Sequence, residues 1–412
     1  MSGWRDTTIG GLGRVVTGST PPSKHPDWFG DDLPFVTPSD ITFGNRRPRP
    51  ERWLSQSGRD GLRTRVVPPG SAAFVCIGAT IGKVCLVETE AITNQQINTV
   101  IPGPHTDSRF LYSLLRHLAP TVTQGASGAA TPIINKSAFS AIPVRTPDLE
   151  TQVRIGEVLG ALDDLIENNR RRVEVLEEMA RAIYREWFVK FRYPGHEDVP
   201  MVDSALGLIP EGWQVGELND LVQLIRDTVD PAAIDAETPA VGLEHIPRKQ
   251  ITLDSWGTAG DQGSRKGVFE KGDVLFGKIR PYFHKVSVAP IDGICSTDAI
   301  VLRPASEHWG QAVFVLSSGE LVAHATATSN GTKMPRADWK VLGRWPVALP
   351  PSAIAGQFTE IARDQLEMAE ALMFENARLT NLRDLLLPKL VTGKIDVTSL
   401  DLDAAGAEQV AE

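Results

Sequence analysis

Cysteine is scarce in this sequence, and the three cysteines present do not suit a structural framework. Cys76, Cys85 and Cys295 are odd in number and none belongs to a CxxC pair. Disulfide frameworks and zinc sites need paired, closely spaced ligands, and the eight histidines form no HExxH pair either. The sequence therefore argues against both classes, and we expect the thiols to be small buried apolar residues and the chain to hold no metal.

Long apolar runs and targeting segments are also missing. No stretch of about eighteen apolar residues offers a membrane span. The first residues, MSGWRDTTIGGLG, contain neither a basic nor an apolar leader region. We therefore expect a cytoplasmic protein without membrane contact.

Complete catalytic signatures are a third absence. The segment 272–278, GDVLFGK, fits the phosphate-binding pattern GxxxxGK, but Ile279 replaces the Ser or Thr that would hold Mg²⁺, and Pro281 interrupts the helix that should follow. An Asn/Asp-Pro-Pro-aromatic tetrad, typical of amino-methyltransferases, does not occur. We therefore expect a chain without catalytic residues or a bound cofactor.

The net charge of −9 by itself disfavours nucleic-acid binding, but the charges are unevenly distributed along the chain. Residues 1–147 carry 15 Lys and Arg against 10 Asp and Glu, whereas every later part of the chain is acidic. Because phosphate contact depends on local potential, the total does not exclude DNA as a partner.

Two stretches have apolar residues alternately three and four positions apart, the repeat of a paired helical seam. The first runs from Leu149 to Phe191 and the second begins at Ile354. Each predicts a long helix, and antiparallel pairing of the two is the favoured arrangement, although an ordinary core helix stays open for the first stretch alone. The predicted seam residues are Leu162, Ile166, Asn169, Val173, Leu176, Ile183 and Trp187 in the first, and Ile354, Phe358, Ile361, Gln365, Met368, Leu372, Leu379, Leu382 and Leu386 in the second.

The sequence repeats itself at an offset of about 200 to 205 residues. PFVTPSDI (34–41) lines up with PAVGLEHI (239–246), and NQQINTVIP (94–102) with STDAIVLRP (296–304). Short apolar strands separated by Gly, Pro and Asp turns, with a short helix at 108–118, indicate an α+β fold for the repeated unit. Two copies in one chain predict a pseudo-two-fold object.

This pattern divides the chain into five parts. We predict two copies of the α+β domain at 1–147 and 196–350, a central helix at 148–195, a distal helix at 351–395 and an acidic, flexible tail at 396–412.

Three segments carry a resemblance to a known family. LEEMARAIYREWFVKFRYPGHE (176–197), VDSALGLIPEGW (202–213) and LRDLLLPKLVTGKI (382–395) resemble the central and distal regions of specificity subunits of Type I restriction-modification systems. GRVVTGSTP (13–21) resembles the start of that family's target-recognition domains, whereas LIRDTV (224–229) stands at the matching place in the second copy.

The resemblance implies a non-catalytic DNA-reading subunit. Each recognition domain reads one half of a split double-stranded target, and the paired helices set the distance between the halves. It further implies two methyltransferase subunits and a restriction or translocase subunit as partners, which carry the S-adenosylmethionine and ATP. A twin-domain scaffold that binds proteins is the alternative.

The candidate DNA contacts are basic, amide or hydroxyl side chains in loops. The arginine-rich segment 44–65 offers planar guanidinium groups, and the alternation in 278–284 predicts a strand with its polar side chains on one face. For single residues, a solvated loop or an ordinary turn is the alternative. The candidates are Arg46, Arg47, Arg49, Arg52, Gln95, Gln96, Thr131, Lys136, Arg248, Lys278, Arg280, Tyr282, His284, Asn330, Lys333 and Arg336.

Overall fold

A computed structural model describes residues 3–126, 133–331 and 333–397. The chain forms two compact units: unit 1 consists of Met1–Asn168 and Ala377–Glu412, and unit 2 of Asn169–Asn376. The boundaries lie inside the two long helices, so each unit contains part of both. Most of the predicted acidic tail lies outside the described residues. The three cysteines are buried, as expected, and burial raises the pKa of the Cys76 thiol to about 11.

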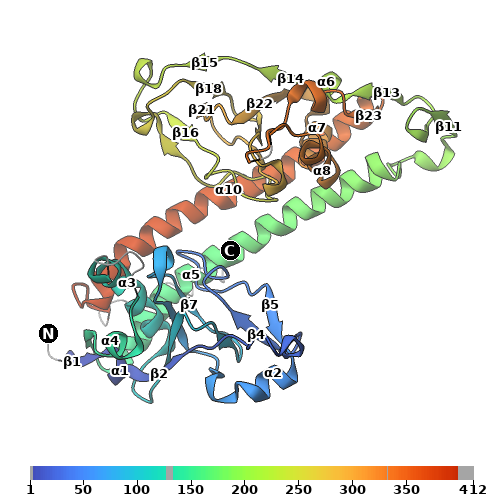
Figure 1. Ribbon diagram of the computed structural model, residues 1–412. Coiled ribbons are helices and arrows are strands. Elements are labelled where there is room, and N and C mark those ends of the chain that lie inside the picture. The colour runs from blue at the N-terminus through green and yellow to red at the C-terminus, as the bar shows by residue number, and fades with distance from the viewer. Residues whose placement is uncertain (1–2, 127–132, 332, 398–412) are drawn as a thin grey trace, which may run out of the picture. The chain divides into compact units, whose positions relative to one another are not determined.

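Unit 1 is an α+β unit built on two small sheets (Figure 1). The first sheet, in the order β2-β9-β6-β7, is antiparallel, and in the second, β3-β5-β4-β8, the β4–β8 pair is parallel. Strands β1 and β10 form a separate antiparallel pair. The strands are β1 (Arg5–Thr8), β2 (Gly13–Thr17), β3 (Phe29–Gly30), β4 (Leu33–Val36), β5 (Arg52–Leu54), β6 (Ala72–Val75), β7 (Val84–Leu86), β8 (Ile92–Thr93), β9 (Ile97–Pro102) and β10 (Pro143–Thr146). The shorter helices are α1 (Ile9–Leu12), α2 (Gln56–Gly61), α3 (Ser108–Ala126) and α4 (Lys136–Ser140).

Unit 2 repeats the first sheet of unit 1 and the parallel pair of the second, although its second sheet has five strands in the order β15-β18-β21-β16-β17. Its sheet β14-β22-β19-β20 has the strand order of β2-β9-β6-β7, and the parallel β16–β21 pair corresponds to β4–β8. The strands are β11 (Met201–Ser204), β12 (Gly207–Pro210), β13 (Gln214–Glu217), β14 (Val222–Ile225), β15 (Thr228–Val229), β16 (Pro239–Val241), β17 (Gly257–Thr258), β18 (Lys266–Phe269), β19 (Val274–Gly277), β20 (Val286–Val288), β21 (Gly293–Cys295), β22 (Ala299–Pro304) and β23 (Pro346–Leu349). Its shorter helices are α6 (Leu218–Leu221), α7 (Trp309–Leu316), α8 (Gly319–Ala327) and α9 (Trp339–Leu342).

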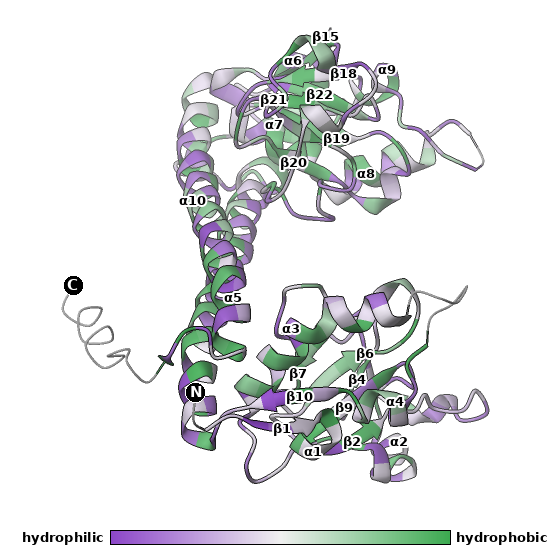
Figure 2. Cartoon of the chain, turned by 90° about the vertical axis from the view of Figure 1, so that its left-hand side faces the viewer, coloured by the Kyte–Doolittle hydropathy of each residue, from purple (hydrophilic) through white to green (hydrophobic). Residues whose placement is uncertain are grey.

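The first sheet of each unit is preceded by the same local structure, a capped one-turn helix. A one-turn helix precedes the first strand, α1 before β2 and α6 before β14. The Thr8 hydroxyl accepts a hydrogen bond from the Gly11 amide at the start of α1, and Glu217 and Asp220 form a capping box at the start of α6. Figure 2 shows that apolar residues concentrate in the strands of both units.

The two long helices are α5 (Leu149–Tyr184), extended by a π-helical turn at Arg185–Val189, and α10 (Ser352–Val391). In unit 1, Ile155 and Leu159 of α5 share a core with Leu387 and Leu390 of α10. The Asp163–Arg383 ion pair follows, so the residue numbers rise along one helix as they fall along the other. The helices therefore run antiparallel there.

Unit 2 shows the same antiparallel pairing. Asn169 of α5 donates a hydrogen bond to Glu375 of α10 at 3.1 Å, and Val173 packs with Ala369 and Leu372. At the far end of this pair, Trp187 stacks near Phe358, with ring centroids 5.8 Å apart. The α+β class and the antiparallel helix pair are thus as predicted.

The seam of α10 differs from the predicted one in its second half. Met368 and Leu382 are 51% and 46% exposed, whereas their neighbours Ala369 and Arg383 are buried at 0% and 2%. Ala369 packs with Val173 of α5 and Arg383 pairs with Asp163 of α5, so the line of α10 residues that faces α5 lies one residue beyond the predicted one. In α5, Ile166, Asn169, Val173 and Trp187 are buried.

The remaining predicted seam residues are partly or fully buried. Phe358 and Leu372 are buried, and Leu162, Leu176, Ile183, Ile354, Ile361, Gln365, Leu379 and Leu386 are half-buried. No described helix is both long and apolar enough to cross a membrane.

Candidate nucleic-acid interface

The clearest candidate site is a cleft of about 660 Å³ in unit 2. It opens where β14 and β19 end, beside the segment that follows α8. Its lining includes four basic side chains, Arg226, Lys278, Arg336 and Lys340, and only two acidic ones, Asp227 and Asp338. The cleft therefore carries a local excess of positive charge within an acidic chain.

Backbone hydrogen bonds build this cleft from two segments that are far apart in sequence. Arg280 donates its amide hydrogen to Pro335 O at 2.8 Å, and the Ala337 amide donates to Lys278 O at 2.9 Å. Asn330 and Arg336 pair across the loop between them. As a result, three predicted DNA contacts, Lys278, Asn330 and Arg336, lie together on one wall of the cleft.

The opposite side of the cleft was not predicted. Arg226 lies just after β14, at the place in the repeat where unit 1 has the TGSTP segment, and Lys340 lies in α9. The sequence signal for Arg226 was its position in the repeat, because the segment 224–229 stands where a family motif is expected. Lys340 had no comparable signal.

Residues 278–284 do not form the predicted strand. Strand β19 ends at Gly277, and a single 3-10 turn at Pro281–Phe283 follows, flanked by Arg280 and His284 in left-handed conformations with φ of 50° and 52°. Pro281 removes a ladder donor and fixes the turn, so the expected alternation of faces is lost.

The turn instead sorts the predicted contacts into two groups. Tyr282 and Arg280 are exposed, and the exposed Arg248 guanidinium lies 4.1 Å from the Phe283 ring centroid. His284 points the other way and its Nε2 donates to Ser317 O at 2.9 Å. Burial, reinforced by Arg181 and Lys249, lowers the pKa of His284. His284 is therefore a neutral structural residue, which corrects its assignment as a DNA contact.

In unit 1 the arginines of the segment 44–65 also fall into two groups, one bound within the fold and one exposed. Arg46 is 7% exposed, forms an ion pair with Asp164, and donates to Gly160 O at 3.3 Å. A guanidinium held by a helix carboxylate and carbonyl is not available to phosphate, so the prediction of Arg46 as a DNA contact is wrong. Arg47 pairs with Glu88, with 2.6 Å between Nε and Oε1.

The other predicted residues of unit 1 are placed closer to solvent. The exposed Arg52 stacks 3.8 Å above the Phe29 ring, beside Trp53, which is 41% exposed. Gln95 is exposed and contacts the Thr20 hydroxyl, which also accepts a hydrogen bond from Asn94 at 3.0 Å. This arrangement places the Gln95 amide, a group of the kind that can pair with adenine, beside the segment Gly18–Thr20.

The remaining predicted DNA contacts differ in how exposed their side chains are. Gln96 is half-buried, and Arg49, Lys136 and Lys333 are exposed. Thr131 lies outside the described residues. Among the described residues, no three or more His, Cys, Asp or Glu side chains gather as a metal site would require.

Basic and amide side chains thus lie in loops of both units of the repeated fold. Residues 1–178 match the family model described as "Type I restriction modification DNA specificity domain". The chain is 24% identical, over 96% of its length and 94% of the relative's, to the Type I restriction enzyme MjaIX specificity subunit of Methanocaldococcus jannaschii. Residues 1–178 therefore belong to this family of Type I specificity domains, and the whole chain is similar to Type I specificity subunits.

Further comparisons of the chain agree. It is 32% identical to the HindI specificity subunit of Haemophilus influenzae over 36% of its own length and 33% of the relative's. It is 24% identical to the EcoDI specificity subunit of Escherichia coli over 70% of both chains. The crystal structure of a Type I S subunit from M. genitalium matches the fold with a TM-score of 0.56 and 14% identity, over 94% of this chain and 96% of that one.

Proposed function

We propose that this specificity subunit reads a bipartite double-stranded DNA target, one half with each recognition domain. The observation that carries the proposal is the repetition of one α+β unit in one chain, the second copy with the basic cleft described above. Lys278 and Arg336 contact base edges or phosphates of the second half-site, together with Arg226 and Lys340. In unit 1, Gln95, Arg49 and Arg52 serve the first half-site.

The helix pair sets the unread distance between the half-sites and docks two methyltransferase subunits. Matching positions of the repeat support docking: Met179 of α5, 48% exposed, and Leu382 of α10, 46% exposed, lie 203 residues apart, the same offset as the first residues of the two helices. Apolar side chains exposed at equivalent sites suit two copies of one partner. A restriction or translocase subunit joins them, and S-adenosylmethionine and ATP are bound by the partners.

The test is a reconstituted complex with methyltransferase, followed by single-molecule methylation sequencing. We expect one bipartite target with the wild-type chain. The double variant Lys278→Ala/Arg336→Ala is expected to relax one half-site only, by about tenfold to a hundredfold per lost base contact, or to reduce the slope of log K against log salt by about one to two if the contacts are to phosphate.

The matched control is Arg192→Ala, which removes an exposed arginine of unit 2 that does not line the cleft. It is expected to leave target and salt slope unchanged. A complex in which the double variant keeps both half-sites and the wild-type slope would remove the cleft from the interface. A wild-type chain that shifts no duplex sequence-specifically, even with methyltransferase present, would favour the protein-binding scaffold.

A further inference from the structure

Three basic residues of unit 2 have left-handed backbone conformations. They are Lys249, Arg280 and His284, with φ of 60°, 50° and 52°. Apart from Phe191, which follows α5, they are the non-glycine residues with positive φ in the described chain. A side chain strains the backbone in this region, which favours glycine.

The counterpart of Lys249 in unit 1 is Gly44. Strands β7 and β20 occupy the same place in their sheets. The amide of the last residue of β7 donates to Arg46 O, and that of the last residue of β20 donates to Ile251 O, each at 2.8 Å. Gly44 and Lys249 each lie two residues before that carbonyl, and Gly44 has φ of 79°.

The counterparts of Arg280 and His284 are Gly78 and Gly82. Strands β6 and β19 match in the two sheets, and Gly78 and Arg280 are the third residues beyond their ends. The amide of the last residue of each strand donates to the carbonyl just after Gly82 or His284, at 2.9 and 2.8 Å. Gly78 and Gly82 have φ of 67° and 89°, so unit 2 has basic residues at three positions where unit 1 has left-handed glycines.

A fourth left-handed position is glycine in both units. Gly70 and Gly272 have φ of 81° and 90°, and their amides donate to Val87 O at 2.7 Å and Ala289 O at 2.9 Å. Lack of space does not explain the difference at the other positions, because a Cβ at Gly78 would meet no atom within 4 Å. The three basic residues are therefore specific to one region of unit 2.

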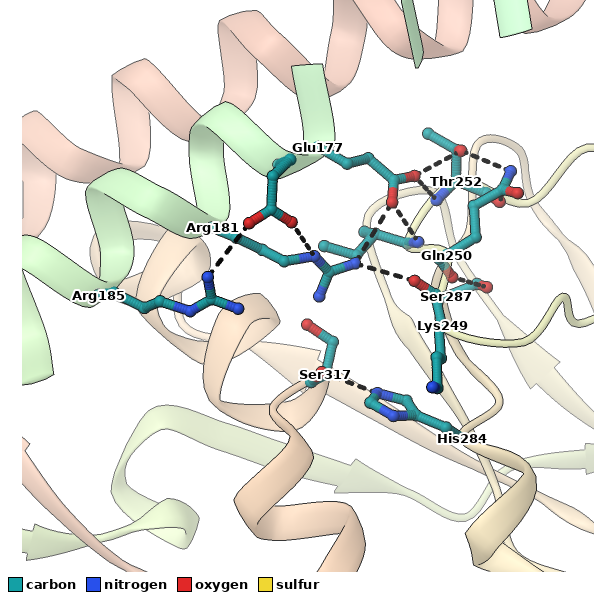
Figure 3. A network of polar contacts seen from close by, with 11 residues as sticks. Glu177, Arg181, Arg185, Lys249, Gln250, Thr252, His284, Ser287 and Ser317 are labelled. Carbon is teal, nitrogen blue, oxygen red and sulfur yellow. Dashed lines mark hydrogen bonds and ion pairs between the residues drawn. The ribbon is translucent and has the colours of Figure 1, made fainter. Parts of the chain in front are cut away.

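These residues gather on one surface of unit 2. The Lys249 amide donates to His284 O at 2.8 Å, and Figure 3 shows the two residues beside each other. The guanidinium groups of Arg248 and Arg280 lie 4.1 and 6.0 Å from the centroid of the Phe283 ring. Arg248, Lys249 and Arg280 are all exposed.

The positive charge of this surface acts on two neighbouring bases. Burial lowers the pKa of Lys285, and Arg248 lowers it further, against the opposing effect of Glu244. Lys249 acts in the same direction on His284, whose pKa is lowered chiefly by burial. A region that disfavours further positive charge attracts an anion.

Backbone strain persists where a side chain has a role that the surrounding structure supports. His284 has a structural one, because it binds Ser317 O, whereas the side chains of Lys249 and Arg280 are exposed. We propose that Arg248, Lys249 and Arg280 form a phosphate-binding surface of unit 2, which contacts the DNA backbone beside the basic cleft.

The position of this surface fits that role, which rests on the proposed function. The Arg280 amide donates to Pro335 O, and the next residue, Arg336, lines the cleft. Phosphate contacts position a duplex without reading its sequence. Unit 2 thus has backbone contacts that unit 1, with Gly44 and Gly78, lacks at the same positions.

Glycine substitutions test the surface, because glycine keeps the left-handed backbone and removes the charge. In the complex reconstituted with methyltransferase, we expect Lys249→Gly/Arg280→Gly to reduce the slope of log K against log salt by about two. The reduction should be equal on the target duplex that methylation sequencing defines and on an unrelated duplex, and both half-sites should stay unchanged. His284→Gly, which changes the same kind of position without removing an exposed cation, is the control and should keep the wild-type slope.

Thermal unfolding of the full-length chain separates this role from a structural one. The double glycine variant is expected to unfold at or above the wild-type midpoint, because it relieves strain. Lys249→Ala/Arg280→Ala should lose the same salt slope but unfold below the glycine variant, because alanine keeps the strain.

An unchanged salt slope in the double glycine variant would overturn the proposal, and a midpoint below that of the alanine variant would show that no strain is present to be explained. Loss of discrimination at one half-site, with the slope unchanged, would assign the side chains to bases. Weaker retention of methyltransferase, again with the slope unchanged, would assign them to a protein partner. A wild-type complex that binds neither duplex would refute the proposed function itself.

Discussion

Arg46 shows how a residue of a cationic loop can serve the fold. Its guanidinium lies among Asp164, Glu88 and the Gly160 carbonyl, and these neighbours raise its already high pKa further against the opposing effect of burial. Desolvating a cation is costly, and the nearby carboxylates offset that cost. The loop is therefore held on α5 by Arg46.

We accordingly predict that Arg46→Ala destabilises the chain without changing its DNA contacts. The loss should be on the order of 2 kcal/mol, because charge-assisted hydrogen bonds to Asp164 and Gly160 disappear. Thermal unfolding and the salt dependence of DNA binding measure the two effects. The exposed Arg49 is the reference for the salt slope: Arg49→Ala should flatten it by about one. A flatter salt slope for Arg46→Ala with an unchanged unfolding midpoint would show that Arg46 contacts DNA.

His284 gives unit 2 a dependence on pH. Because the pKa of the folded residue is lowered from 6.5, the unfolded chain binds the proton more readily as pH falls through about 6.5. Stability contributed by neutral His284 is thus fully present above that pH and decreases below it. We expect His284→Asn, which tolerates the left-handed backbone, to remove part of the loss in melting temperature between pH 7.5 and 5.5. Identical slopes for variant and wild type would exclude His284 as the titrating group.

At the scale of elements, periodicity predicted the helices well because it is a local property. Ile166, Asn169 and Val173 are three and four residues apart, so they lie on one face of adjacent helical turns, and all three are buried. Burial of Arg46 depends on Asp164, which lies 118 residues away, and no local pattern reports such a partner. Pro281 is a sequence signal for the observed turn, because proline disfavours the interior of a strand. The alternation of polar residues in 278–284 instead predicts a strand, and the structure follows the proline.

The shifted seam of α10 leads to a prediction with a matched pair of substitutions. Ala369 is fully buried against Val173 and Leu372, whereas its neighbour Met368 is half exposed. We expect Ala369→Lys to destabilise the chain by about 3 kcal/mol, because it buries a charge and overfills the seam. Met368→Lys should change stability by about 0.5 kcal/mol or less. Thermal unfolding followed by circular dichroism measures both, and equal losses would restore the predicted seam.

At the scale of the whole molecule, the repeat gives one chain two recognition domains and two helices in alternating order. Each unit combines a segment of α5 with a segment of α10, but only unit 1 is assembled from two separate stretches of sequence, whereas unit 2 is the continuous stretch Asn169–Asn376. Unit 1 needs residues after Ala377 for its core, where Leu387 and Leu390 pack with Ile155. Folding of the first recognition domain is therefore coupled to the last helix of the chain.

The length of the helix pair is expected to set the unread spacer of the target. Removing one heptad from each helix, residues 168–174 of α5 and 371–377 of α10, deletes about 10 Å of paired helix at about 1.5 Å per residue. This length corresponds to about three base pairs of duplex. Seven residues are close to two helical turns, so the flanking seams keep nearly the same facing. We expect methylation sequencing of the reconstituted complex to find both half-sites retained and the spacer shortened by about three base pairs. Deleting the heptad from α10 alone should abolish methylation, because the seams no longer match. A target with its original spacing after the double deletion would show that the helices do not measure the distance.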